Sequence, residues 1–282
     1  MPDNTPLANK TASAASVPSD PVAGDLAGQV LVPRWPGLPA SVRALSTMRG
    51  GGVSAAPYDD GQGGGGLNLG VHVNDAPEAV AVNRARLRRL LPAEPAWLTQ
   101  VHGTTVVNAA LVQGAQAPPD ADASVATEPG TVCVIMTADC MPVLLADLDG
   151  KVVGAAHAGW RGLASGVLEA TVAAMRAAGA GELTAWLGPG IGPRHFEVGA
   201  EVPPAFARLG NGAAAAFVPL AGKPGKFLGD LPHLARLALA RAGVAAVHGG
   251  EDCTVSDASR FYSFRRDRVT GRMASLVWIR PD

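Results

Sequence analysis

Three apolar segments and one tight turn lie in residues 131–162, TVCVIMTADCMPVLLADLDGKVVGAAHAGWRG. Residues 131–137 have the β-branched, apolar composition of a buried strand. Residues 143–147 and 152–156 flank Asp149-Gly150, a pair typical of two-residue hairpin turns. We therefore expect a buried strand followed directly by an antiparallel hairpin.

The register of this hairpin brings a cysteine and a histidine together. If Leu148 pairs with Lys151, His157 lies opposite Pro142. Cys140 is two residues from Pro142 along the same strand, so its side chain points to the same face. Diagonal neighbours on one face lie roughly 7–8 Å apart, which is within reach of a shared metal ion.

His102 is a third candidate ligand, in a turn-like sequence between the apolar segments 97–101 and 104–107. One thiolate and two imidazoles are three protein ligands, the number that a catalytic zinc site uses while a fourth position stays open. For Cys140 and His157 the alternative is a buried apolar cysteine and a core histidine. The hairpin does not fix the position of His102, so the pattern alone leaves its membership open.

The composition limits the class of protein. With 282 residues the chain is long enough for one large domain with a substantial core. Its net charge of −1 gives no electrostatic footprint for nucleic acid or an anionic membrane. No run approaches the roughly 20 apolar residues of a membrane span. We expect neither nucleic acid nor a membrane as partner, and a monomer or small homo-oligomer.

The first 28 residues differ from the rest of the chain. They are rich in Ala, Ser, Pro and Asp and lack the apolar core of a secretory signal. We expect a disordered N-terminal tail over residues 1–28 and a single domain over residues 29–282. The three cysteines, an odd number without an export signal, indicate reduced thiols and a cytoplasmic location.

Helical periodicity predicts helices over residues 77–91, 163–178 and 231–242. On the first, the arginines, among them Arg84 and Arg86, are expected to form a solvated outer face. Strand-like segments interleave with these helices without a regular βαβ rhythm, and one hairpin is present. The expected fold class is therefore mixed α+β.

A set of short motifs extends from about residue 42 to the C-terminus. They lie at residues 46–54 (STMRGGGVS), 67–73 (LNLGVHV), 100–103 (QVHG), 138–143 (ADCMPV), 157–162 (HAGWRG), 188–193 (GPGIGP), 261–267 (FYSFRRD) and 270–272 (TGR). Together they resemble the laccase-domain family, whose members are described as multicopper polyphenol oxidases, peptidoglycan editing factors or purine nucleoside phosphorylases.

The resemblance implies a fold, a metal and an activity. The fold would be a mixed β-sheet sandwich with flanking helices, similar to cytotoxic-necrotizing-factor catalytic domains and some cysteine hydrolases. The family's metal ligands fall on His102, Cys140 and His157, with zinc as the metal. The activity would be phosphorolysis of adenosine, inosine, guanosine and methylthioadenosine, with adenosine deamination as a side activity. Its partners are then a purine nucleoside and phosphate.

Phosphorolysis requires a phosphate site. Arginine suits phosphate because its planar fork binds oxyanions through two N–H groups. The candidates are Arg49, in a loop followed by glycines, and the pair Arg265 and Arg266, for which solvated or salt-bridged roles are the alternative. Asn68 is a candidate contact for ribose or base, and Asp139 a candidate for orienting a metal ligand.

Two other functions stay open. A Cys/His hydrolase would use Cys140 as thiolate nucleophile and His157 as base, on amides or peptidoglycan precursors, and would not need His102. A polyphenol oxidase would use bound copper, which competes with zinc at nitrogen and sulfur sites in vitro. Six histidines are too few for a trinuclear cluster beside a blue-copper site, so one chain does not supply multicopper chemistry.

Overall fold

The computed structural model describes Leu26 and residues 28–281. The predicted disordered tail, residues 1–28, therefore lies mostly outside the described residues. Leu26 is 1% exposed and packs in an apolar cluster with Leu45 and Leu276. The packed part of the chain thus includes a residue from the stretch that the composition assigns to the tail.

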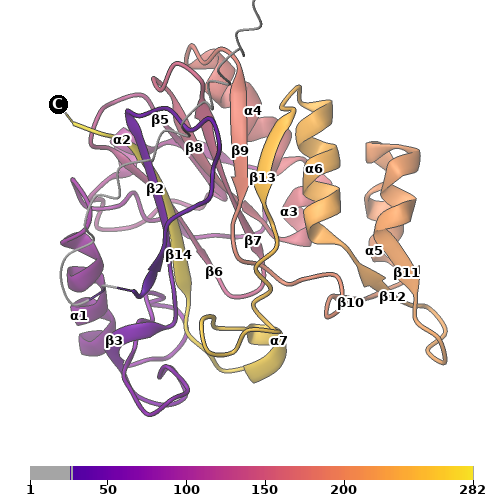
Figure 1. Cartoon of the computed structure of the whole chain (residues 1–282), viewed down its shortest axis with the longest axis horizontal. Helices are drawn as coiled ribbons and strands as arrows, with labels where there is room; N and C mark the ends of the chain where they lie inside the picture. The colour runs from indigo at the N-terminus through magenta and orange to yellow at the C-terminus, as the bar shows by residue number, and fades with distance from the viewer. Residues whose placement is uncertain (1–25, 27, 282) are drawn as a thin grey trace, which may run out of the picture.

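Two large β-sheets form the centre of the protein, which is mixed α+β as predicted (Figure 1). The first is antiparallel, in the order β1 (Val30–Leu31), β2 (Val42–Thr47), β14 (Met273–Ile279) and β6 (Val132–Thr137). The second has the order β13 (Ala246–Gly249), β9 (Leu183–Leu187), β7 (Met141–Asp147), β8 (Val153–Ala158), β5 (Ala123–Ala126) and β4 (Val106–Asn108). Its outer pairs are parallel and its central pairs antiparallel.

The two sheets pack on one another through apolar side chains. One buried cluster joins Ile135 and Val277 of the first sheet with Leu144 and Ala155 of the second. Because strand side chains alternate between faces, each sheet also has an outer apolar face that helices must cover.

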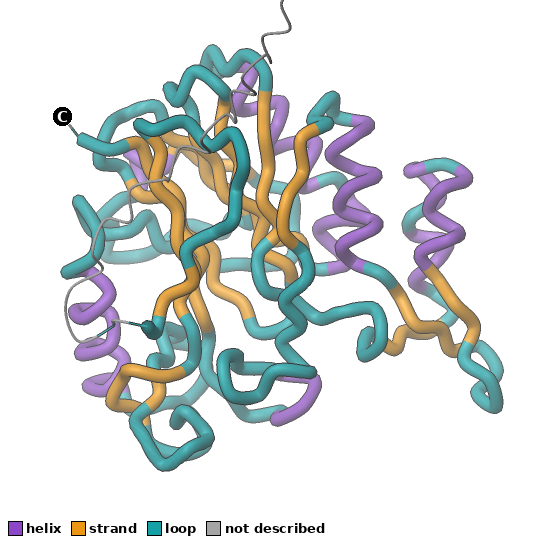
Figure 2. The backbone as a smooth tube through the Cα atoms, viewed as in Figure 1, coloured by secondary structure: helices purple, strands orange, loops and turns teal. Residues whose placement is uncertain are grey.

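Helices cover both outer faces (Figure 2). Leu87 of α1 (Pro77–Arg88) packs with Val134 on the outer face of the first sheet. The second sheet is covered by α3 (Trp160–Ser165), α4 (Val167–Ala177) and α6 (Leu231–Arg241). The result is the sandwich with flanking helices that the motifs imply.

The β7–β8 hairpin has the predicted register, with Pro142 opposite His157. The Asp147 carboxylate holds the turn by accepting two backbone N–H groups at 2.7 Å each. Gly150 adopts a φ of 70°, which favours glycine over residues with a side chain. Local turn chemistry therefore determines which residues of the two strands face one another.

Two details differ from the expectations. The helix predicted over residues 163–178 is two helices, because Gly166, with a φ of 102°, separates α3 from α4. Arg84 and Arg86 of α1 are not a solvated face: they donate to the backbone carbonyls of Leu69 and Gly51, respectively. These neighbouring segments supply acceptors that the helical pattern does not reveal.

The remaining elements are short. A three-stranded sheet with adjoining helical turns lies beyond α6, on the side away from α1 (Figure 1). Its strands are β10 (Glu197–Gly199), β12 (Lys226–Gly229) and β11 (Phe217–Pro219), and its helical turns are α5 (Val202–Ala205), η1 (Ala207–Leu209) and η2 (Asn211–Ala216). Three further short elements lie outside this sheet: β3 (Gly50–Ser54), α2 (Ala109–Val112) and α7 (Phe264–Asp267). Within Leu26 and residues 28–281, no helix combines the length and apolarity needed to cross a membrane.

Candidate metal centre

The three candidate ligands converge at one end of the second sheet. Cys140 directly precedes β7, His157 lies near the end of β8, and His102 lies in a loop before β4. Their ligand atoms all lie within 4.8 Å of one another, and Cys140 Sγ is 3.6 Å from His102 Nε2. Tetrahedral zinc, with bonds of about 2.1 Å to nitrogen and 2.3 Å to sulfur, separates two such ligand atoms by about 3.6 Å. The donor types and their spacing therefore fit one zinc-sized ion.

Unusual backbone conformations and one glycine shape this cluster. His102 has a φ of 61° and Asp139, next to Cys140, a φ of 93°, both in a region that non-glycine residues seldom occupy. A Cβ atom built on Gly159 would lie 2.6 Å from His102 Cδ2 and 3.1 Å from Cys140 Sγ. A side chain at position 159 would thus displace two of the three ligands.

A buried carboxylate, which the sequence analysis did not identify, joins the two histidine segments. Asp122 Oδ1 accepts hydrogen bonds from His157 Nδ1 at 2.8 Å and from the His102 N–H at 2.9 Å, and Oδ2 accepts one from the Gly103 N–H at 2.6 Å. Burial opposes the charge on Asp122, but the hydrogen bonds from His157 and Gly103 outweigh it and lower the pKa of this carboxyl. Since Nδ1 of His157 is engaged, Nε2 is the nitrogen left for a metal.

Asp139 anchors the segment that carries Cys140. Its carboxylate accepts hydrogen bonds from Thr254 Oγ1 and from the Arg265 N–H, each at 2.6 Å. It therefore ties the segment that carries Cys140 to the C-terminal loops. The carboxylate that contacts a candidate ligand is Asp122, whose signal in the sequence was a buried acid directly before an apolar strand, β5.

The cluster has coupled acid–base properties. Burial would raise the pKa of Cys140, but the positive charge of His157 and hydrogen bonds with both histidines lower it to about 6. Burial would lower the pKa of His157, but the negative charge of Cys140 and the hydrogen bond with Asp122 raise it. In the absence of a metal, these shifts favour a thiolate beside an imidazolium. Cys133, by contrast, is fully buried in β6, and burial raises its pKa to about 12.

Two of the predicted substrate residues are buried and occupied by other parts of the chain. The Arg49 guanidinium donates to the carbonyls of Asp59 and Ala258 at 2.9–3.2 Å. Asn68 is fully buried, and its Oδ1 accepts N–H groups from Gly70 at 3.0 Å and Arg272 at 2.8 Å. Both side chains stabilise the loops that carry them.

The other two predicted residues lie on α7. Arg266 donates to the carbonyls of Thr254 and Phe261 and pairs with Asp267 at 2.7 Å. Arg265 Nη1 donates to the Glu197 carbonyl at 3.0 Å, while its Nε and Nη2 have no hydrogen-bond partner among the described residues. The structure thus brings together the three ligands, whereas the guanidinium groups of these arginines contact backbone carbonyls of several loops.

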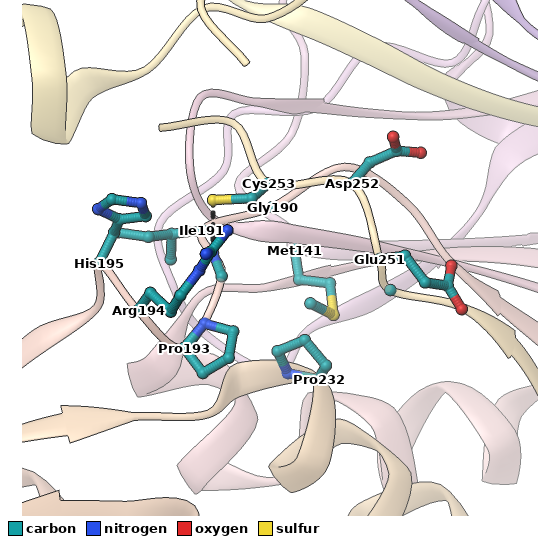
Figure 3. Close-up of a pocket in the computed structure, with 12 residues that line it drawn as sticks. Met141, Gly190, Ile191, Pro193, Arg194, His195, Pro232, Glu251, Asp252 and Cys253 are labelled. Atoms are coloured by element: carbon teal, nitrogen blue, oxygen red, sulfur yellow. Dashed lines mark hydrogen bonds between the residues drawn. The ribbon is translucent and has the colours of Figure 1, made fainter. Parts of the chain in front are cut away.

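A separate pocket contains none of the three ligands (Figure 3). Met141 lines it, and neighbouring side chains of a strand point to opposite faces, so this pocket lies across the strand from Cys140. In it, Cys253 Sγ accepts a hydrogen bond from the Gly192 N–H at 3.2 Å, drawn as a dashed line in Figure 3. We do not assign this pocket to the metal centre.

Comparisons with known proteins place these features in a wider group. Residues 43–280 match the family described as "Multi-copper polyphenol oxidoreductase laccase". The chain is 55% identical over 249 residues to a Pseudomonas aeruginosa protein named purine nucleoside phosphorylase PA4543, covering 88% of this chain and 98% of that protein. It is 48% identical over 253 residues to the Escherichia coli protein named purine nucleoside phosphorylase YfiH, covering 89% and 99%.

Solved structures resemble the fold as well. The Neisseria meningitidis protein NMB0706 superposes with a TM-score of 0.82 at 48% sequence identity, over 90% of this chain and 100% of that one. YlmD from Geobacillus stearothermophilus superposes with a TM-score of 0.76 at 30% identity, over 87% and 94%.

Proposed function

This chain belongs to the multi-copper polyphenol oxidoreductase laccase family, and within it we propose that the chain is a zinc-dependent purine nucleoside phosphorylase. The observation that carries the proposal is the cluster of His102, Cys140 and His157, in a chain that matches relatives of that name over nearly their full length. The substrates we propose are phosphate and the nucleosides adenosine, inosine, guanosine and methylthioadenosine.

The donor set favours zinc. One thiolate and two imidazoles leave a fourth position open, as catalytic zinc sites do, and zinc bound there would supply a Lewis acid for a substrate or water oxygen. Copper accepts the same donors and competes for them in vitro. Among the described residues this is the one group of three or more side chains suited to a metal, which does not support an oxidase with several copper centres.

Residues of the chain itself prepare the site. Asp122 fixes the orientation of His157 and the backbone at His102, and Gly159 leaves the space that the ligands occupy. For Arg49, Asn68, Arg265 and Arg266, direct contact with substrate stays a prediction. Counting partners within Leu26 and residues 28–281, Arg265 is the arginine of this group whose guanidinium keeps N–H groups without a hydrogen-bond partner, so it is the first of the four to test.

One observation favours a second candidate. Cys140, His157 and Asp122 form a chain of contacts in which the pKa of the thiol is lowered, the arrangement of a cysteine hydrolase. Such an enzyme would act on amides or peptidoglycan precursors and would not need a metal. His102, whose Nε2 is 3.6 Å from the thiol, is the residue that the metal proposal needs and the hydrolase does not.

The test is metal analysis combined with an assay of base release. We expect about one zinc per chain, and release of purine base that requires phosphate, stops on chelation and returns with added zinc. Formation of inosine from adenosine in the same assay reports the proposed deaminase side activity. Full activity after verified removal of zinc, with rapid inactivation by iodoacetamide, would favour the cysteine hydrolase instead. Base release that does not depend on phosphate would also contradict the proposal.

A further inference from the structure

An arginine that the sequence analysis did not assign lies beside the ligand cluster. Arg272 directly precedes β14, and in the β14–β6 register Met273 lies opposite Thr137. β6 ends at Thr137, three residues before Cys140, so Arg272 is at the end of the sheet from which the chain continues to the metal centre. The side-chain stem of Arg272 passes over Gly70, where an added Cβ would lie 2.8 Å from its Cγ.

A second arginine reaches the same place from α1. The Arg84 guanidinium lies over the Trp97 ring, 3.9 Å from its centroid, and its Nη2 is 3.9 Å from Sδ of Met136 on β6. The Leu69 backbone lies between the two arginines: its carbonyl accepts Arg84 Nε at 3.0 Å, and its N–H donates to the Arg272 carbonyl at 3.1 Å. The two arginines are therefore held on one segment next to the end of β6.

Neither guanidinium forms an ion pair within the part of the chain that the structure describes. Arg272 Nη1 donates to the Thr270 and Gly271 carbonyls at 3.1 Å, and its Nε and Nη2 have no partner among those residues. Burial lowers the pKa of Arg84 and the negative charge of Glu94 partly opposes the shift, but the Glu94 carboxylate forms no ion pair with Arg84. Instead it accepts a hydrogen bond from Trp97 Nε1 at 2.7 Å. A half-buried guanidinium without a carboxylate partner attracts an anion.

Electrostatic effects agree with this geometry. Burial lowers the pKa of Arg272, and the negative charge of Cys140 partly opposes the shift, which places the two groups within electrostatic range. Burial and the charges of Arg272 and Arg84 lower the pKa of His72, so this imidazole is near both arginines and tends to be neutral. The region beside the cluster thus carries two positive charges.

We propose that Arg272 and Arg84 form a phosphate subsite next to the metal centre. That the anion is phosphate rests on the proposed function, whereas the binding of an oxyanion at this place rests on the two guanidinium groups. In phosphorolysis a phosphate oxygen bonds to ribose C1′ as the C1′–N9 bond breaks, and the departing purine takes up the proton that the phosphate gives up. Phosphate must therefore be held beside the nucleoside, and two planar guanidinium groups can each donate two hydrogen bonds to its oxygens.

The first measurement is binding of inorganic phosphate to the full-length, zinc-loaded protein without nucleoside, by calorimetry. We expect Arg272→Gln and Arg84→Gln each to raise the phosphate Kd by roughly tenfold or more, as loss of a charge-assisted hydrogen bond does. Arg280→Gln is the matched control, because Arg280 is exposed at the opposite end of β14. Arg272→Met keeps the stem that passes over Gly70 and replaces the Gln variant if that one does not fold. Wild-type phosphate binding in folded variants of both arginines would overturn the subsite.

The second measurement separates this proposal from the proposed function. In the base-release assay the same variants should raise the KM for phosphate by roughly tenfold or more and leave the KM for nucleoside nearly unchanged. Base release with a wild-type phosphate KM in both variants overturns the subsite but leaves the function intact. If Arg265→Gln alone raises the phosphate KM, the subsite belongs to Arg265 and our assignment is wrong. Phosphate binding that depends on Arg272 without any base release supports the subsite and contradicts the function.

Discussion

At the ends of β7 and β8, the donor atoms of Cys140 and His157 meet those of His102 within 4.8 Å, whereas the guanidinium groups of Arg49 and Arg266 are occupied by backbone carbonyls. The sequence makes both sets of residues candidates for function, because thiols and imidazoles bind metals and guanidinium groups bind phosphate. Only the cysteine–histidine cluster keeps its donor atoms available for an external ligand. A side chain is available for function when its polar atoms are not needed to satisfy the fold, and this depends on the neighbours that tertiary structure supplies.

The largest effect expected from this comparison follows from removing the thiolate. Cys140→Ala leaves two imidazoles, so zinc affinity should fall on the order of 1,000-fold while the fold is kept. Competition with a chromogenic chelator measures the affinity, and Cys253→Ala, in the separate pocket, is the control. An unchanged affinity in Cys140→Ala would show that the three side chains do not share a metal.

Alkylation compares two cysteines seven residues apart. In metal-free protein at pH 7, Cys140, with a pKa of about 6, is mostly thiolate, whereas Cys133, with a pKa of about 12, is protonated and buried. Iodoacetamide should modify Cys140 at least about 100 times faster, as peptide mass spectrometry can measure. The rate at Cys140 should fall as the pH decreases below 6, because the thiolate takes up a proton. Added zinc should protect Cys140, and fast alkylation of the zinc-loaded protein would contradict coordination.

Asp122→Asn tests how much the buried carboxylate contributes. The amide can still accept hydrogen bonds, but it no longer supplies the charge that supports His157, so zinc affinity should fall by roughly 10- to 100-fold. Asp149→Asn, in the exposed β7–β8 turn, makes the same chemical change far from the cluster. Equal zinc affinity in the two variants would mean that Asp122 serves only the fold.

The smallest effect on the site is expected from Arg49→Met. The substitution leaves the Asp59 and Ala258 carbonyls without donors, so the free energy of unfolding should decrease by about 1–3 kcal/mol in urea denaturation. Arg34→Met, at an exposed position, should change it by less than about 0.5 kcal/mol. The phosphate KM of the folded variant should be unchanged. A tenfold rise would instead make Arg49 a phosphate ligand, as the sequence first suggested.

The parts of the site that the sequence predicted are those governed by local rules. The Asp149-Gly150 turn sets the register that puts His157 opposite Pro142, and strand alternation then brings Cys140 to the same face. These contacts involve residues close in sequence. The shared motifs supplied His102, which no local rule could place.

Contacts between distant segments could not be predicted in this way. Asp122 accepts a hydrogen bond from a residue 35 positions away, and the segment at Asn68 meets Arg272 across 204 positions. The sequence pattern of α1 likewise gave no sign that Arg84 would lie over Trp97, because an arginine on a helix is most often solvated.

The sequence by itself determined the mixed α+β class, the hairpin and the set of side chains that can ligate a metal. Periodicity, turn chemistry and residue type are properties of short segments, so they can be read without the tertiary structure. Tertiary structure decided which polar atoms stay free. Packing of the loops around the sheets satisfied Arg49 and Arg266 with carbonyls. Within the part of the chain that the structure describes, it left Arg84 and Arg272, near the end of β6, without carboxylate partners. The reason is physical: a buried polar group must find a partner, and the partner comes from whichever segment the fold brings near.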